Sequence, residues 1–354
     1  MYIVIAILMF SFLIFIHEFG HFITAKLFDV KVNEFSIFMG PRLLHWGKGE
    51  TEYSLRLLPI GGYCAMEGEE GDSDDPRSFA KKAPWKRIII LAAGATMNFL
   101  TGLLLLAVIY TTAGGFRTLE ITGFLDGCPL EGTLRTGDII EEIDGDNLYI
   151  FSDFSMLLER AGEGKMDITV RRNGERITLR DVDMVKRSYD VDGQTMQLYG
   201  ISFEGVEEKS LGSVLKNAWW TSVDFGRMVK MGLLDLISGR AGLKDMSGPV
   251  GIVDAVQETG KSAENTLDGV LNVMYFCAFI AVNLAFMNML PIPALDGGHI
   301  FLLLITWLIE SVTRRKIDPK YEAYIHAAGM VLLLAFMVVV TANDIFKLFT
   351  GGAG

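Results

Sequence analysis

Long runs of apolar residues, broken by a few polar positions, set the pattern of this chain. An α-helix needs ~20 predominantly apolar residues to cross a lipid bilayer. Four stretches are long enough, and we expect membrane-spanning helices at residues 1–28, 88–113, 268–312 and 322–348. The first stretch has no basic segment before it and no small-residue cleavage site after it, so we expect a retained helix rather than a signal peptide. The pattern predicts a polytopic α-helical membrane protein.

The segments between the apolar runs have patterns of their own. Residues 29–64 alternate apolar and polar positions on both sides of Gly47-Lys48-Gly49, which is typical of a β-hairpin, and its apolar tip could dip into the membrane. A charged linker follows at 65–87. Short strand-like runs separated by turns predict one inserted α+β domain at 117–205. Residues 209–262 predict amphipathic helices that lie on the membrane surface.

Basic residues beside the apolar runs predict the orientation in the membrane. Lys81-Lys82 and Lys86-Arg87 stand directly before the second run, and Arg314-Arg315-Lys316 lies between the third and the fourth. Such residues gather on the cytoplasmic side. We therefore expect a multi-pass membrane protein with both termini and residues 117–205 outside the cytoplasm.

The composition narrows the functional classes. Hydrophobic residues make up 50% of the chain and charged residues 21%, which suits a membrane protein that carries polar segments. The formal net charge of −11 argues against nucleic acid as a partner, because phosphate contacts need a basic surface. Cys64, Cys128 and Cys277 are far apart, so neither a disulfide framework nor a cysteine zinc site is expected.

The motif His17-Glu18-Phe19-Gly20-His21 lies inside the first apolar run. Residues four apart on a helix share one face, so both imidazoles could bind one Zn²⁺ ion at ~2.0–2.1 Å. Glu18 could then take a proton from zinc-bound water and pass it to the leaving amine. Alternatively, the polar side chains pair without a metal. Ionisable residues within a bilayer cost roughly 2.5–3.5 kcal/mol each, which favours a functional metal site.

A catalytic zinc usually has three protein ligands and one open position. Asp296 lies well inside the third apolar run, and we expect it to join His17 and His21 near the cytoplasmic side. His299 is a competing ligand. Asp296 could also be only a turn residue before Gly297-Gly298.

Pro291 and Pro293 interrupt regular helix at membrane depth. Free backbone groups are tolerated there only against protein or a water-lined cavity. The prolines are consistent with an active site that needs water, and also with a simple packing kink.

Several motifs, in order along nearly the whole chain, resemble the site-2 protease family of intramembrane zinc metalloproteases, in particular its bacterial RseP-type branch. They are His-Glu-Phe-Gly-His at 17–21, Phe38 through Leu43, Tyr53 through Tyr63, Arg77-Ser78-Phe79 with Trp85-Lys86-Arg87, and Asn288 through Gly298. Gly94-Ala95-Thr96-Met97-Asn98 departs from the Gly-Pro that the family commonly has before the Asn. We expect this departure to change packing of the second span rather than the metal chemistry.

The resemblance implies a fold, roles and substrates. It implies His17, His21 and Asp296 as ligands of one catalytic Zn²⁺, Glu18 as general base, and Asn288, Pro291 and Pro293 as substrate-binding residues. The β-hairpin would be membrane-reentrant and would pair with an unwound substrate strand. Expected substrates are pre-trimmed single-span membrane proteins, such as anti-sigma factors or remnant signal peptides, in a bacterial cell membrane.

Residues 117–205 resemble a PDZ domain of the bacterial protease type, through Gly127-Cys128-Pro129 and residues 137–145. The resemblance implies that one such domain excludes bulky, uncut substrates by size. Cys128-Pro129-Leu130 replaces the usual Ser-Pro-Ala run, which leaves peptide binding by its groove open.

Two other functional classes stay open. The chain could be a catalytically silent membrane scaffold that binds partners through its PDZ-like domain, although it keeps both histidines, the glutamate and the aspartate. It could also be a transporter, but the four expected spans show no repeat. We expect the protease.

Overall fold

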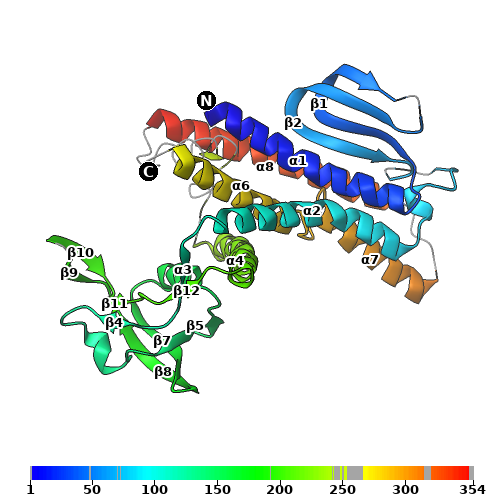
Figure 1. Cartoon of the computed structure of the whole chain (residues 1–354). Coiled ribbons are helices and arrows are strands. Elements are labelled where there is room, and N and C mark those ends of the chain that lie inside the picture. The colour runs from blue at the N-terminus through cyan, green and yellow to red at the C-terminus, as the bar shows by residue number, and fades with distance from the viewer. Residues whose placement is uncertain are drawn as a thin grey trace. The chain divides into compact units, whose positions relative to one another are not determined.

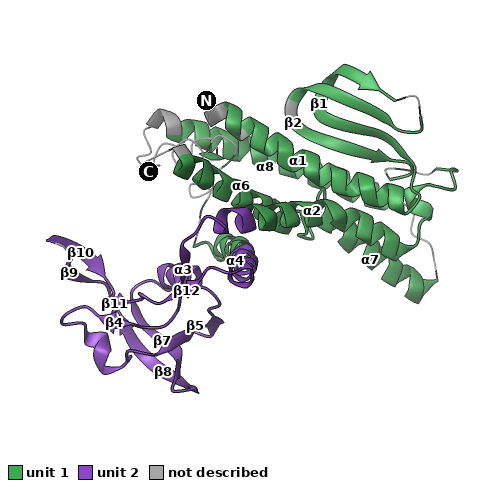
Figure 2. Ribbon diagram, viewed as in Figure 1, with its two compact units in different colours: residues 1–105, 225–354 green, residues 106–224 purple. Residues whose placement is uncertain are grey.

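The chain forms two compact units in the computed structural model (Figure 2). Residues 1–105 and 225–354 make up the first unit, and residues 106–224 make up the second. The structure describes residues 2–47, 49–69, 71, 73–191, 193–240, 242, 248, 251–252, 266–314 and 320–350.

Long helices dominate the first unit (Figure 1). The long helices of the chain are α1 Tyr2–Leu27, α2 Pro84–Tyr110, α4 Leu211–Ser238, α6 Thr266–Asn288, α7 Asp296–Thr313 and α8 Lys320–Thr350. All except α4 are long and apolar enough to cross a membrane, which makes five such helices in the described part of the chain. The boundaries between the units fall within α2 and α4.

The expected third span, residues 268–312, is two helices in the structure, so the four expected spans correspond to five candidate helices. α6 ends at Asn288 and α7 begins at Asp296. Proline cannot continue a helix ladder, and the intervening loop contains Pro291, Pro293 and an Ala294 with a φ of 79°. The prediction of one span interrupted by these prolines is therefore wrong, since the prolines lie between the end of one helix and the start of another.

Strands β1 (Val32–Trp46) and β2 (Glu52–Met66) pair antiparallel, in the region where the sequence predicts a β-hairpin. Both strands bend at residues with positive φ, among them Gly40 and Gly61. Because of the bends, the first part of β1 has neighbours on both sides: Phe35 pairs with Cys64 and also with Tyr53. The hairpin is therefore a small sheet.

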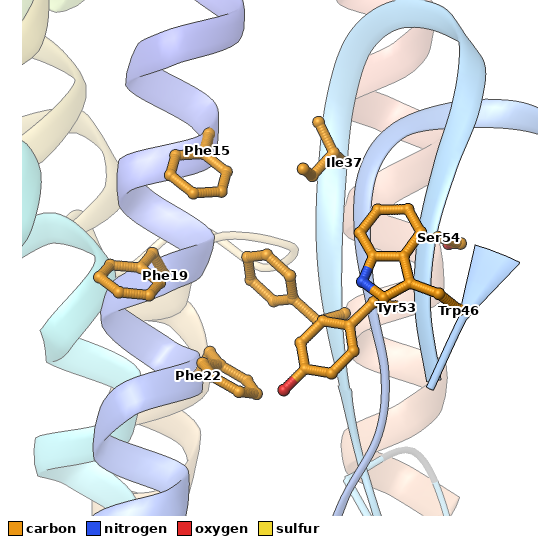
Figure 3. A pocket seen from close by; sticks show the side chains of 8 residues that line it. Phe15, Phe19, Phe22, Ile37, Trp46, Tyr53 and Ser54 are labelled. Atoms are coloured by element: carbon orange, nitrogen blue, oxygen red, sulfur yellow. The ribbon is translucent and has the colours of Figure 1, made fainter. Parts of the chain in front are cut away.

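One face of this sheet packs against α1. Phe35, Cys64 and Met66 belong to a buried core cluster with residues of α1 and α2 such as Ala25 and Ile90. An apolar cavity of about 230 Å³ remains between α1 and the sheet (Figure 3). Its lining side chains are Phe15, Phe19, Phe22, Phe35, Ile37, Trp46, Tyr53 and Ser54.

Ion pairs connect the turn between β1 and β2 to the end of α1. Glu50, in the turn between β1 and β2, bonds to Lys26 at 2.6 Å and to Arg77. Arg77 Nε also lies 2.8 Å from Asp29. Two hydrogen-bonding cations hold the pKa of Glu50 at about 2. These ion pairs thus connect the end of α1, the β1–β2 turn and the linker that follows β2. The linker also contains the short 3₁₀ helix η1 Phe79–Lys81.

The second unit is built from short strands and two short helices. Its elements are β3 Gly115–Arg117, β4 Gly123–Phe124, η2 Pro129–Gly132, β5 Ile139–Ile143, β6 Asp146–Asn147, α3 Phe151–Ala161, β7 Gly164–Arg172, β8 Glu175–Met184, β9 Arg187–Val191, β10 Gln194–Leu198, β11 Ile201–Ser202 and β12 Val206–Glu208. The largest sheet has the order β6-β5-β7-β8, and the remaining strands pair as β9 with β10, β4 with β11 and β3 with β12.

Alternating burial gives the second unit its own core. Ile140, Ile168 and Val170 point inward from β5 and β7 with no exposed surface. The amphipathic α3 adds Phe154 and Leu157 to the buried set. The N-terminal part of α4 also belongs to this unit, where Trp220 stacks on Tyr149 with ring centroids 3.6 Å apart. Of the amphipathic helices expected at 209–262, residues 241, 243–247, 249–250 and 253–262 lie outside the described residues.

Candidate metal centre

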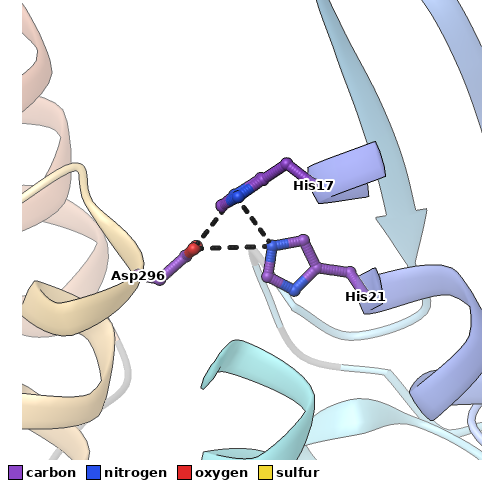
Figure 4. Close-up of side chains that lie close together, drawn as sticks. All are labelled: His17, His21 and Asp296. Carbon is purple, nitrogen blue, oxygen red and sulfur yellow. Dashed lines mark hydrogen bonds and ion pairs between the residues drawn. The ribbon is translucent and has the colours of Figure 1, made fainter. Parts of the chain in front are cut away.

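Two histidines and one aspartate converge on one point in the first unit (Figure 4). His17 and His21 stand one turn apart on α1, as a spacing of four requires. Their Nε2 atoms are 3.2 Å apart, and Asp296 Oδ2 lies 3.1 Å from His17 Nε2 and 3.5 Å from His21 Nε2. The structure thus brings together three of the residues singled out in the sequence, although Asp296 is far from the histidines along the chain.

These three distances fit a bound zinc ion. Ligand atoms placed tetrahedrally at ~2.0–2.1 Å from zinc lie roughly 3.3–3.4 Å from one another. Asp296 Oδ2 is buried, and in the described part of the chain no N–H points at it with hydrogen-bond geometry. A buried carboxylate oxygen beside two imidazole nitrogens, without a donor, is what a cation would satisfy. The donor set of two imidazoles and one carboxylate is one that zinc accepts.

Glycines allow α1 and α2 to approach closely at this point. A Cβ on Gly20 would lie 2.5 Å from the Ala93 carbonyl oxygen, and a Cβ on Gly94 would collide with the rings of His17 and His21. Small residues commonly permit such close helix contacts in membranes. Gly94 therefore opens the space in α2 that the two imidazoles fill.

α2 also orients both rings. His21 Nδ1 lies 2.8 Å from the Ile90 carbonyl oxygen. The side chain of Asn98, which is 1% exposed, lies 3.4 Å from His17 Nδ1. Partners of this kind fix the ring and direct the other nitrogen to a metal. The sequence pattern does not mark Asn98 or Ile90, because their contacts with the rings come from helix packing. The departure from the family's Gly-Pro within residues 94–98 stays a prediction about packing of the second span.

Two glycines place Asp296 at the start of α7. Gly297 and Gly298 are buried, and a Cβ on Gly297 would lie 2.5 Å from the Leu290 carbonyl oxygen. A Cβ on Gly298 would lie 3.0 Å from the Pro293 nitrogen. Only residues without a side chain let α7 begin so close to the end of α6. The two glycines directly after the aspartate meet this steric requirement.

Glu18 lies beside the three residues and is held by the sheet. The backbone N–H of Cys64 in β2 donates to its carboxylate. A Cβ on Gly62 would lie 3.5 Å from Glu18 Cγ, so this part of β2 runs directly against the glutamate. The segment that follows the bend at Gly61 therefore lies beside Glu18.

The other predicted site residues lie at the end of α6 and in the loop after it. Asn288 Nδ2 is 3.5 Å from both ring nitrogens of His17. Pro291 and Pro293 lie in the loop that leads to Asp296, and neither belongs to the three-residue group. His299, the competing ligand, is also not part of that group. Its ring stacks on His326 of α8 at a centroid distance of 3.5 Å.

Comparison with known proteins identifies the family. The profile of peptidase family M50 matches residues 5–336. A Clostridium perfringens protein with the provisional name zinc metalloprotease is 37% identical over 98% of both chains. The Bacillus subtilis protein named regulator of sigma-W protease RasP is 27% identical over 97% of this chain and 98% of its own. The match covers almost the whole chain, and the chain belongs to peptidase family M50, the site-2 protease family of zinc metalloproteases.

Proposed function

We propose that this protein hydrolyses peptide bonds within the transmembrane segments of other membrane proteins. The observation that carries the proposal is the convergence of His17, His21 and Asp296 within candidate membrane-spanning helices. Ionisable residues are costly in a bilayer and generally mark a functional site there. The family supplies the zinc and the protease chemistry.

His17, His21 and Asp296 would hold the zinc, and Glu18 would move the proton. When bound, zinc polarises a peptide carbonyl and makes water acidic enough to react near neutral pH. Glu18 accepts the proton of the attacking water as the new C–O bond forms, and it returns a proton to the leaving nitrogen as the C–N bond breaks. The hydrogen bond from the Cys64 N–H would keep its carboxylate beside the site.

Substrate would bind between the α6–α7 loop and the edge of the sheet. The amide of Asn288 could hold a substrate carbonyl, and Pro291 and Pro293 leave backbone groups of the loop unpaired by helix. A substrate helix must unwind before it can be cut, because its peptide bonds are shielded. The β2 segment after Gly61, which contacts Glu18, could pair with the unwound strand by β-addition.

The second unit would act as a PDZ-like filter outside the cytoplasm. It has its own hydrophobic core, which contains no residue of the metal centre. Substrates would then be single-span proteins trimmed beforehand, such as anti-sigma factors or remnant signal peptides. The Bacillus subtilis relative carries the name regulator of sigma-W protease RasP, which supports the first class. With the basic residues before α2 on the cytoplasmic side, the metal centre would lie near that side.

The test is cleavage of a single-span reporter by the purified full chain in liposomes, together with zinc content. We expect about one zinc per chain, and cleavage that a chelator abolishes. Glu18→Gln should keep the zinc and lower the cleavage rate by ~10²–10⁴-fold, whereas Asp296→Asn should lose both. A folded protein without zinc and without cleavage would support the scaffold class instead.

A further inference from the structure

The loop that carries Asp296 contains a residue in an unfavourable conformation. Ala294, two positions before the aspartate, has a φ of 79°. A residue with a Cβ rarely adopts this left-handed region, because the Cβ crowds the neighbouring backbone. Contacts from elsewhere in the structure must therefore hold the loop in this shape.

The holding contacts come from α8. The backbone N–H of Ala294 donates to His326 Nδ1 at 3.2 Å. One turn further along α8, Gly329 lies against the same loop, since a Cβ there would be 2.8 Å from the Pro293 carbonyl oxygen. The loop thus lies against one face of α8, with His326 bonded to Ala294 and the side-chain-free Gly329 next to Pro293.

His326 also contacts the helix that follows the loop. Its ring stacks on that of His299, with centroids 3.5 Å apart and an interplanar angle of 16°. His299 stands in the first turn of α7, where its N–H donates to the Leu295 carbonyl at 3.1 Å. His326 therefore touches the chain on both sides of Asp296, at Ala294 before it and at His299 after it.

We propose that His326 is a positioning residue for the metal centre. By accepting the Ala294 N–H and stacking on His299, it holds the α6–α7 loop in the shape that presents the Asp296 carboxylate to His17 and His21. The inference rests on the proposed zinc site. It adds a residue of α8, a helix that contributes none of the three residues of that site.

The experiment compares metal binding by variants of the purified full chain in detergent. Metal-free protein is titrated with Co²⁺, whose visible absorption reports both affinity and coordination. His326→Leu removes the acceptor and should weaken Co²⁺ binding by about 10-fold or more, as loss of outer-shell support does. His326→Asn should restore most of the affinity, because the Asn Oδ1 can take the place of Nδ1 as acceptor. His45→Leu, a change of the same kind on the exposed part of β1, is the matched control and should bind like wild type.

A second pair of variants separates positioning from general damage. Ala294→Gly in the His326→Leu background should recover part of the affinity, because glycine adopts a positive φ without strain. Hydrogen exchange of a peptide covering residues 289–295 should be faster in metal-free His326→Leu than in wild type, and slow again in His326→Asn. This measurement does not depend on bound metal or on cleavage.

Three results would overturn the inference. His326→Leu could bind Co²⁺ with wild-type affinity and spectrum, or His326→Asn could bind as weakly as His326→Leu. Unchanged exchange at residues 289–295 in His326→Leu would show that the loop does not need the histidine. Absence of Co²⁺ binding by the wild-type protein would instead overturn the zinc site itself, and this inference with it.

Discussion

His21 Nδ1 lies 2.8 Å from the backbone carbonyl oxygen of Ile90, a residue 69 positions away. A carbonyl only accepts, so Nδ1 carries the proton in this contact. The lone pair is then on Nε2, which faces His17 and Asp296. The backbone of α2 therefore sets both the tautomer of His21 and the direction of its Nε2, the atom that would bind the proposed zinc.

The glycine beneath the two rings should be essential for metal binding. Gly94→Ala places a methyl group where the rings of His17 and His21 now lie, so the rings must move. We expect zinc content, measured by atomic absorption on the purified protein, to fall from about one per chain to far below it. Gly232→Ala on α4, where a Cβ meets no neighbour, is the matched control. Full zinc content in Gly94→Ala would contradict the observed packing.

Asn98 should matter through its carbonyl oxygen. Asn98 Oδ1 is buried, and within the described residues it has no hydrogen-bond partner, while the amide faces His17 Nδ1. Turning the amide over lets Oδ1 accept the Nδ1–H and leaves Nε2 free for the metal. We expect Asn98→Leu to weaken zinc binding ~10–100-fold in a competition assay with a chelating dye. Asn98→Asp keeps an acceptor and should bind more tightly than Asn98→Leu; the reverse order would exclude this role.

The sheet should lose stability in acid through Glu34. Burial opposes its ionisation, but hydrogen bonds from Ser54, Tyr63 and Arg56 outweigh it and hold the pKa at about 2 rather than 4.5. A carboxyl with a lowered pKa stabilises the fold above its unfolded pKa, and that contribution disappears as the pH falls through the folded pKa.

Hydrogen exchange of residues 32–66, corrected for the intrinsic rate, should therefore show constant protection down to a pH of about 4.5. Protection should then fall progressively toward a pH of about 2. Glu34→Gln should remove this part of the pH dependence, while acid loss of metal would remain in both proteins. Equal profiles for the two proteins below a pH of 4.5 would contradict the assignment.

A buried ion pair should stabilise the second unit. Asp138, whose side chain is 1% exposed, accepts from Arg172 Nε at 2.7 Å and from Nη2 at 2.8 Å. Arg172→Leu leaves this carboxylate buried without its cation and should lower the free energy of unfolding of the unit by ~3–5 kcal/mol. Hydrogen exchange of β5 and β7 in the full chain measures the change. Arg180→Leu on the exposed part of β8 should have little effect, and an equal loss in both variants would count against the pair.

Local information predicted much of this protein. The length of the apolar runs indicates membrane helices without any knowledge of packing, because a helix satisfies its backbone groups internally. The spacing of His17 and His21 determines that both rings share one face, since a helix repeats every 3.6 residues. Asp296 could be singled out because a carboxylate in an apolar run needs a partner. The alternation of apolar and polar residues on both sides of residues 47–49 predicted the hairpin, because successive side chains of a strand point to opposite faces.

Other features depend on which residues far apart in the sequence come together. The interruption at Pro291 and Pro293 was visible, but only the packed structure shows two separate helices, α6 and α7. Nothing in the pattern around Asn98 or His326 marks them, because their partners are 81 and 32 residues away. The sequence leaves His299 open as a competing ligand, whereas in the structure its ring stacks on His326 and it lies outside the three-residue group. The sequence by itself determined which residue types could form a metal site. The tertiary structure decided which other side chains orient those residues, because contacts between distant segments depend on helix packing rather than on periodicity.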